Sequence, residues 1–169
     1  MHLRPATPSD LALLRYWNTK PHVIAATGGD GNWDWEAEFA HAPDGRELLI
    51  AEVGGRDIGF MQIMDPAQDE SRYWGEAAPG FRAIDIWIGE EADLGRGHGT
   101  QMMRLALDRC FAGAAVTAVL IDPLTSNTRA HRFYQRLGFT PVERRMFGTD
   151  DCLVHRLERE VWQSQAGRK

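Results

Sequence analysis

Two stretches of the chain carry residue types at spacings suited to holding a phosphate and to moving a proton. The first is a glycine-rich turn before a helix pattern, made of Gly95, Arg96, Gly97, His98, Gly99 and Thr100. Amides at a helix N-terminus lack partners and lie at the positive end of the helix dipole, so glycines there let an anionic phosphate come close. We interpret the turn as a pyrophosphate cradle, with glycines needed only for loop conformation as the alternative. It lacks the Lys-Ser or Lys-Thr of a Walker loop and the full pattern of a dinucleotide fingerprint.

The second stretch combines an aspartate, a polar helix start and a tyrosine. Asp122 ends a β-branched run, and the segment 126–130 opens a helix pattern that contains Tyr134. Upstream, Asp85 interrupts an apolar run over 81–89. A carboxylate in such a run is costly without a partner, so Asp85 is either a functional group or a buried, hydrogen-bonded aspartate.

These residues must be positioned by a mixture of strands and helices. Alternation and turn signals predict strands over 2–6, 47–53, 57–64, 81–89, 116–121, 139–146 and 152–157. Helical spacing and capping signals predict helices from Leu11 to the Lys20–His22 segment, from Trp33 to His41, over 101–111 and over 126–137. Glycine and proline predict a turn over 28–31 and a loop over 65–80. The order βααβββαβαββ predicts a mixed α/β fold in a single domain, 1–169.

Within the strand over 81–89, the alternation predicts two different faces. One face carries Ile84, Ile86 and Ile88. The other carries Ala83, Asp85 and Trp87. We expect this strand to be central in the sheet.

Length and composition are those of one globular domain. The chain has 169 residues, of which 43% are apolar and 25% charged. No stretch approaches the roughly 20 apolar residues that span a bilayer, so we expect a soluble, cytoplasmic protein without a membrane partner. Cys110 and Cys152, with six scattered histidines, fit neither a disulfide framework nor a zinc site. We therefore expect reduced, structural cysteines and no metal.

The net charge of −5 is unevenly distributed. Residues 30–91 carry four basic and fifteen acidic side chains, whereas 92–169 carry twelve basic and eight acidic. This favours a cationic ligand held by the middle of the chain and an anionic one held by the C-terminal half, unless solvated faces simply differ in composition. No basic stripe with interleaved aromatic residues is present, which argues against nucleic acid as a partner.

Taken together, two motifs resemble those of the GCN5-related N-acetyltransferase (GNAT) superfamily. They are G-x-G-x-G-T over 95–100 and S-N-x-R-A-x-x-x-Y-x-x-x-G-F over 126–139. The resemblance implies the element order given above, a central, mostly antiparallel sheet flanked by helices, and acetyl-coenzyme A (acetyl-CoA) as cofactor. One departure is Leu94, which stands at the loop entrance where the superfamily usually has Gln or Arg. The main-chain amides of the cradle are unaffected by that change.

The resemblance extends over nearly the whole chain to the bacterial aminoglycoside 6′-N-acetyltransferases. It is carried by LLRYWNTKPHV over 13–23, Ile58-Gly59, Tyr73-Trp74 and PGFRAID over 79–85, in which Ala83 replaces a glycine. Related siderophore-precursor N-acetyltransferases share the tryptophan and Pro-His segment.

Acetyl transfer to an amine needs an acceptor for the ammonium proton and stabilisation of the leaving thiolate. Asp85 is the candidate base, directly or through water, with simple binding of the ammonium as the alternative. Tyr134 matches the superfamily's general acid, with a core aromatic as the alternative. The resemblance implies cofactor contacts from the glycine turn and from Ile86, Trp87, Ile88, Asn127, Arg129 and Ala130. It implies substrate contacts from Asp122, Glu76, Trp74 and Tyr73.

Each of these assignments has a structural alternative. Asp122 is also typical of a turn before proline, and Asn127 of a helix N-cap. Glu76 with Tyr73 and Trp74 forms either an acidic, aromatic wall against a sugar ring or an ordinary solvated loop. Helical arginines such as Arg129 are more often solvated than bound to phosphate.

Three functions therefore compete. The first is aminoglycoside 6′-N-acetylation, the second acetylation of a siderophore precursor or another small amine, and the third CoA binding without catalysis. The acidic middle segment favours the first, because a cleft of negative sign concentrates a polycationic amine. The presence of both Asp85 and Tyr134 argues against the third. We expect a monomer or homodimer.

Overall fold

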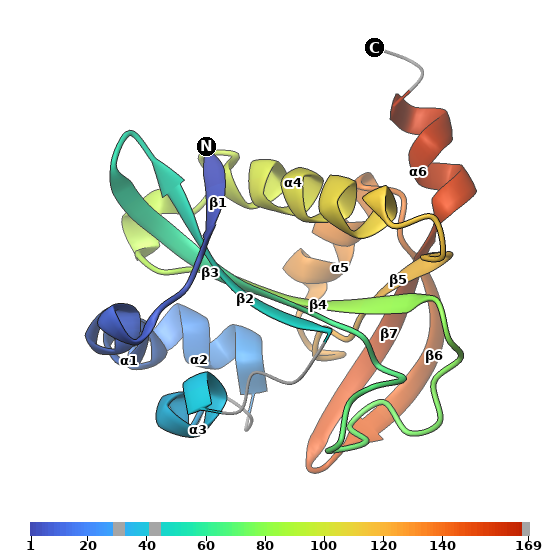
Figure 1. Ribbon diagram of the computed structural model, residues 1–169, viewed down its shortest axis with the longest axis horizontal. Helices are drawn as coiled ribbons and strands as arrows, with labels where there is room; N and C mark the ends of the chain where they lie inside the picture. Colours follow the sequence, from blue (N-terminus) through green and yellow to red (C-terminus); the bar gives the residue numbers. More distant parts are fainter. Residues whose placement is uncertain (29–32, 41–44, 167–169) are drawn as a thin grey trace.

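The computed structural model describes residues 1–28, 33–40 and 45–166. Its strands form a seven-stranded sheet in the order β1-β2-β3-β4-β5-β7-β6 (Figure 1). Their bounds are β1 His2–Pro5, β2 Arg46–Val53, β3 Arg56–Met64, β4 Phe81–Ile88, β5 Ala118–Ile121, β6 Thr140–Phe147 and β7 Asp150–Glu158. The predicted mixed α/β fold with a mostly antiparallel sheet is confirmed, because among the described strands only the β4–β5 pair is parallel.

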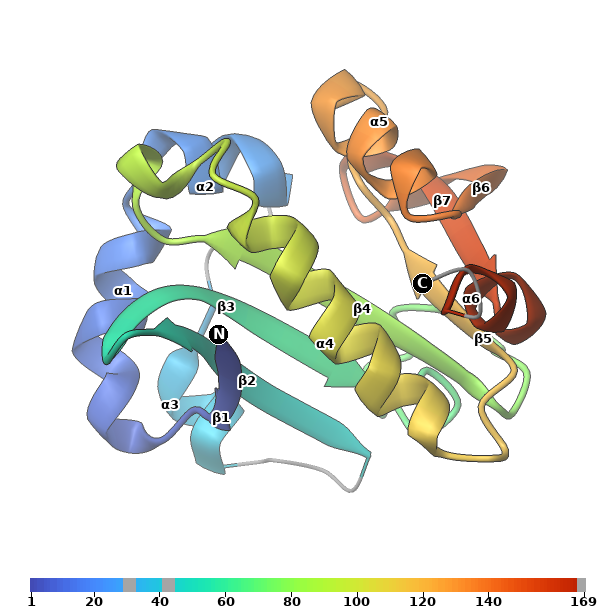
Figure 2. The same ribbon diagram turned by 90° about the horizontal axis from the view of Figure 1, so that it is seen from above.

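Helices cover both faces of the sheet. Helices α1, α2 and α3 lie on one face of β2, β3 and β4, and α4 lies across the other (Figures 1 and 2). Their bounds are α1 Leu11–Asn18, α2 Pro21–Thr27, α3 Trp35–Ala40, α4 His98–Ala112, α5 Thr128–Arg136 and α6 Arg159–Ala166. The expected glycine turn at 29–31 and the expected helix end at His41 fall outside the described residues.

Two helices were not predicted. We expected Pro21 to end the first helix, but it begins α2, because Lys20 before it is extended (φ −73°, ψ 130°) and proline suits a first helical turn. Helix α6 follows β7 directly at Arg159, without a loop or capping signal that would mark its start. Both corrections add a helix and leave the predicted order of strands intact.

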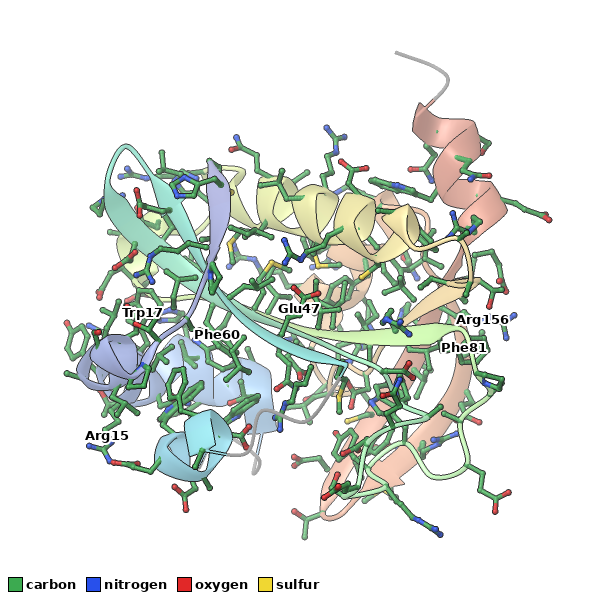
Figure 3. The ribbon with its side chains drawn as sticks, viewed as in Figure 1. Arg15, Trp17, Glu47, Phe60, Phe81 and Arg156 are labelled. Carbon is green, nitrogen blue, oxygen red and sulfur yellow. The ribbon has the colours of Figure 1, made fainter. Side chains whose placement is uncertain are left out.

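The two faces of β4 differ as predicted. Ile84 packs with Met102 and Met103 of α4, whereas Trp87 packs with Phe60 on the face covered by α1–α3. Figure 3 shows Phe60 on the side of the sheet that faces these helices. This second cluster is rich in aromatic rings, and the Phe60 and Trp87 ring centroids are 4.5 Å apart. Asp85 therefore projects from the sheet on the aromatic side.

Strands β4 and β5 pair over only part of their length. The register joins Phe81 to Ala118, Arg82 to Val119 and Ala83 to Leu120, and no further pair follows in the described sheet. Strand β4 nevertheless continues to Ile88. Its backbone beyond Ala83 therefore lacks a strand partner on the β5 side, and the two strands diverge there.

Candidate active site

A cavity of about 750 Å³ opens where β4 and β5 diverge. Its lining includes Ile84, Ile86 and Ile88 from the α4 face of β4, and also Asp85 and Trp87 from the aromatic face. Residues of both faces can line one space only if that space passes between the strands. The carboxyl ends of parallel strands are also where ligands bind in open α/β sheets.

The glycine turn forms one end of this cavity. Gly95, Gly97, Gly99 and Thr100 line it, whereas Arg96 and His98 do not. Gly95 and Gly97 have φ of 75° and 84°, a conformation that favours glycine. A Cβ on either would meet nothing within 4 Å, so the turn leaves open space in front of the start of α4. This geometry fits the predicted anion cradle.

An ion pair fixes the turn to the sheet. The Arg56 guanidinium donates to both Asp93 carboxylate oxygens, at 2.6 and 2.9 Å, and Asp93 is buried. This pairing lowers the pKa of Asp93 below its usual value, so the carboxylate stays charged. Leu94, which replaces the superfamily's polar residue, lines the cavity beside it.

Helix α5 contributes the opposite wall. The structure brings Asn127, Arg129, Ala130 and Tyr134, all expected as site residues, to the lining of this cavity. The Asn127 side chain accepts a hydrogen bond from the Ala130 amide at 3.0 Å and so caps the helix. Arg129 is exposed, which leaves its guanidinium available to a phosphate.

Tyr134 is the buried phenol of the site. Burial raises its pKa above the usual value for tyrosine, and the charges of Asp85 and Asp122 act in the same direction. The phenol is therefore protonated at neutral pH and can donate a hydrogen bond. Its pKa responds to both carboxylates, so the three groups belong to one electrostatic cluster.

Asp85 lies opposite Gln62 in the β3–β4 register. The Gln62 side-chain amide donates to Asp85 Oδ2 at 2.8 Å. Asp85 is only partly buried and lines the cavity. Its carboxylate is thus hydrogen-bonded from the sheet side and can still be reached from the cavity.

Asp122 and Tyr73 meet at the end of β5. The Tyr73 hydroxyl donates to Asp122 Oδ2 at 2.6 Å, and its ring stacks on Phe147 with centroids 4.4 Å apart. Both Tyr73 and Asp122 line the cavity. The loop that carries Tyr73 is therefore attached to the end of β5 and to the β6–β7 hairpin.

The expected wall of Trp74, Glu76 and Tyr73 forms only in part. Trp74 is 5% exposed, its ring packs edge-on against Phe147, and it is not among the residues that line the cavity, so the structure does not bring it there as the expected stacking surface for a sugar. It serves as an anchor for the loop, and its carbonyl accepts a hydrogen bond from Arg145. Glu76 is exposed and does not line the cavity.

Sequence reasoning missed further residues of the lining. Asp150, the first residue of β7, lies so near the end of α2 that a Cβ on Gly28 would be 2.6 Å from its Oδ2, and it lines the cavity. Trp33 stacks on Trp35, with centroids 5.0 Å apart, and also faces the cavity. The signal for Trp33 was a tryptophan pair beside a glycine turn. Nothing in the local sequence places Asp150, since its position depends on how the last hairpin folds back.

The acidic character of the cavity has a different source from the one expected. Its carboxylates are Asp85, Asp93, Asp122 and Asp150, and only Asp85 comes from the acidic segment 30–91. Many acids of that segment lie in ion pairs, namely Glu36 with Arg15, Glu38 with Arg46, Glu47 with Arg109, Asp57 with Arg4, Asp65 with Arg82 and Glu90 with Lys20. The negative charge of segment 30–91 thus pointed to an acidic site, but most of the carboxylates that line the cavity come from other parts of the chain.

Comparisons with known proteins agree with this geometry. An acetyltransferase (GNAT) domain model matches residues 6–147. An aminoglycoside N(6')-acetyltransferase type 1 from Klebsiella pneumoniae is 31% identical over 81% of this chain and 72% of the relative. The crystal structure of aminoglycoside acetyltransferase AAC(6')-Ib in complex with coenzyme A and kanamycin superimposes with a TM-score of 0.86 at 25% identity, covering 97% of this chain and 98% of that one. An N-hydroxyputrescine acetyltransferase from Acinetobacter baumannii is 22% identical over 95% of this chain and 78% of the relative. Within the described residues, no helix has the length and apolarity to cross a membrane.

Proposed function

Because the chain belongs to the GNAT acetyltransferase family, we propose that it transfers the acetyl group of acetyl-CoA to the 6′-amine of aminoglycosides. One observation carries the proposal. One cavity is lined both by the glycine turn, whose amides suit an anion, and by the carboxylates Asp85, Asp122 and Asp150. A further lining carboxylate, Asp93, is paired with Arg56. That division of charge matches an anionic acyl donor and a polycationic acceptor.

The residues present fit acetyl-CoA. The amides of the 95–100 turn would hold its pyrophosphate, with Arg129 nearby. The edge of β4 that β5 leaves unpaired, Ile86 to Ile88, offers main-chain groups to the amides of an extended pantetheine arm. Ile86 and Ile88 turn their main-chain groups to that edge, where the Ile88 carbonyl lies 2.9 Å from His22 Nε2. Trp87 lies opposite Phe60, so its main-chain groups face β3 and its ring packs against Phe60. When bound, acetyl-CoA supplies a thioester carbonyl activated toward amines.

The chemistry requires a group that accepts the proton of the substrate ammonium and a group that stabilises the leaving sulfur. Asp85 accepts a proton from the substrate ammonium, which frees the nitrogen lone pair to form the new N–C bond. The Tyr134 phenol donates a hydrogen bond to the sulfur that takes the electron pair of the broken C–S bond. The raised pKa of Tyr134 keeps that donor protonated throughout the neutral range.

The remaining cavity groups suit an amino sugar. Asp122 and Asp150 would bind ammonium groups that do not react, and Trp33 and Tyr73 offer ring faces to the apolar side of a sugar. Several carboxylates around one cavity suit a substrate with several ammonium groups better than a substrate with a single amine. This favours an aminoglycoside over the siderophore precursor as the substrate.

A cytoplasmic location, where acetyl-CoA is made and thiols stay reduced, is part of the proposal, and it agrees with the buried thiols of Cys110 and Cys152. A monomeric or homodimeric state stays a prediction. So does the absence of a nucleic-acid partner.

The test uses the purified protein with acetyl-CoA and kanamycin. We expect release of free thiol that depends on both compounds, and a monoacetylated product whose fragmentation places the acetyl group on the 6′-nitrogen. Putrescine and N-hydroxyputrescine serve as comparison substrates. Turnover of these diamines without turnover of kanamycin would replace the proposal with small-amine acetylation, and acetylation at another nitrogen would refute the regiochemistry.

A further inference from the structure

A row of polar groups runs behind Asp85 on the aromatic face of the sheet. Arg46 on β2, Gln62 on β3 and Asp85 on β4 project from the same face, since Arg46 pairs with Met64 and Gln62 with Asp85. Arg46 Nε donates to Gln62 Oε1 at 2.6 Å, and Gln62 Nε2 donates to Asp85 Oδ2 at 2.8 Å. Gln62 is 3% exposed, so water cannot replace either contact.

The partners fix which way the Gln62 amide points. Arginine has only donors, so the group facing Arg46 must be the amide oxygen. The amide NH₂ is then directed at Asp85. The reverse orientation would place donor against donor and oxygen against carboxylate, which makes two repulsive contacts in a buried site.

Arg46 is itself held in place. Its guanidinium forms an ion pair with Glu38 of α3 at 2.6 Å and lies over the Trp33 ring, 5.9 Å from the centroid. Burial raises the pKa of Glu38, an effect that the Arg46 charge opposes. Arg46 is thus fixed by groups other than Gln62, and its position determines the orientation of the amide.

We propose that Gln62, oriented by Arg46, is a positioning residue that holds Asp85 as a directed carboxylate and keeps the arginine charge one side chain away from it. The proposal rests on the function assigned above to Asp85. A hydrogen bond to a carboxylate favours the ionised form, whereas a direct arginine pair would favour it so strongly that the group would be a poor base. The neutral amide provides the hydrogen bond and separates the two charges.

The variant that tests this is Gln62→Glu. Glutamate has nearly the same size and can still accept from Arg46, but it cannot donate to Asp85 and places a second carboxylate against it. Tyr134 from α5 is electrostatically coupled to Asp85 and to Asp122, and Tyr134 and Asp122 remain unchanged in the variant. Gln68→Glu is the matched control, because the Gln68 amide donates to Asp65 at 3.0 Å away from the cavity.

Two readouts are needed. With kanamycin, we expect Gln62→Glu to lower kcat about tenfold or more and to move the rising limb of kcat/KM upward by about one pH unit, whereas Gln68→Glu matches the parent. Unfolding is then measured against pH for the parent, Gln62→Glu, Asp85→Asn and the double variant. The parent and Asp85→Asn should differ in free energy of unfolding by an amount that depends on pH. The pH midpoint of that difference should rise by a similar amount when both proteins also carry Gln62→Glu.

The unfolding cycle needs no substrate, so it tests the inference even if the parent fails to acetylate kanamycin. If Gln62→Glu does not fold, Gln62→Met removes the donor without adding charge, and the same upward direction is expected with a smaller shift. An Asp85 midpoint that is unchanged in the folded variant would overturn the proposal. A fall in kcat without a shift of either midpoint would assign Gln62 a packing role only.

Discussion

Replacement of Asp85 by asparagine separates the charge and proton-accepting roles of that residue from its structural contact with the sheet. Asparagine has the same size, and its side-chain oxygen can still accept the hydrogen bond that Gln62 Nε2 makes at 2.8 Å. What it loses is the negative charge and the capacity to take a proton. The interstrand contact should survive, and the thermal midpoint and the stabilisation by acetyl-CoA should stay close to those of the parent.

The expected loss of rate follows from the role of a general base. Such a group contributes about 10² to 10⁴-fold, which is about 2.7 to 5.4 kcal/mol in the activation free energy. We expect Asp85→Asn to lower kcat by that factor with saturating kanamycin. The pH dependence should change as well, because the rising limb of kcat/KM reports deprotonation of the base or of the amine.

The assay is thiol release measured across the neutral and mildly alkaline range. Asp108→Asn is the control, since this aspartate is exposed on α4 and does not line the cavity. A rise in KM alone, with kcat and its pH dependence intact, would show that Asp85 binds the ammonium without taking its proton. The base would then be Asp122, Asp150 or a water.

Three further perturbations test other parts of the site. Tyr73→Phe removes the 2.6 Å hydrogen bond to Asp122 and keeps the ring. KM for kanamycin should therefore rise about fivefold, which corresponds to about 1 kcal/mol of binding free energy, with kcat little changed. An equal fall in kcat would contradict a binding role. Gly97→Val forces a β-branched residue to φ 84° and should reduce the increase in thermal midpoint caused by acetyl-CoA, whereas an undiminished increase would argue against the cradle. Burial raises the pKa of Tyr134, so stability present at neutral pH is lost as the pH rises above about 10, where the unfolded phenol ionises first. Tyr134→Phe should weaken that alkaline loss relative to the exposed control Tyr16→Phe, and identical alkaline curves would refute the raised pKa.

Most of the fold could be predicted because its signals are local. The alternation of Ile84, Asp85 and Ile86 separates the faces of β4, and the glycine turn before α4 marks a helix start whatever lies around it. The missed helix α2 shows the limit of such signals. Proline both ends helices and begins them, and the extended conformation of Lys20 decides between the two.

The site could be predicted where one motif carries the residues, and not where distant segments meet. Tyr134 and Asn127 share a helix, so their sequence spacing places both at the cavity. Trp74 and Tyr73 are neighbours, yet the first is buried against Phe147 and the second faces the cavity. Asp150 belongs to the site only because the last hairpin reaches the end of α2.

The divergence of β4 and β5 explains how one cavity can hold ligands of opposite charge. Beyond Ala83 the unpaired edge of β4 opens the sheet, so the space in front of α4 is continuous with the space beside Asp85. The glycine turn lines that space, and so do the carboxylates Asp85, Asp122 and Asp150. A donor bound at the turn and an amine bound at the carboxylates would therefore meet at the opening in the sheet. Tyr134 and Asp85, the proposed acid and base, both line that space. The same break in strand pairing that leaves β4 incomplete would therefore bring the donor and the acceptor together beside them.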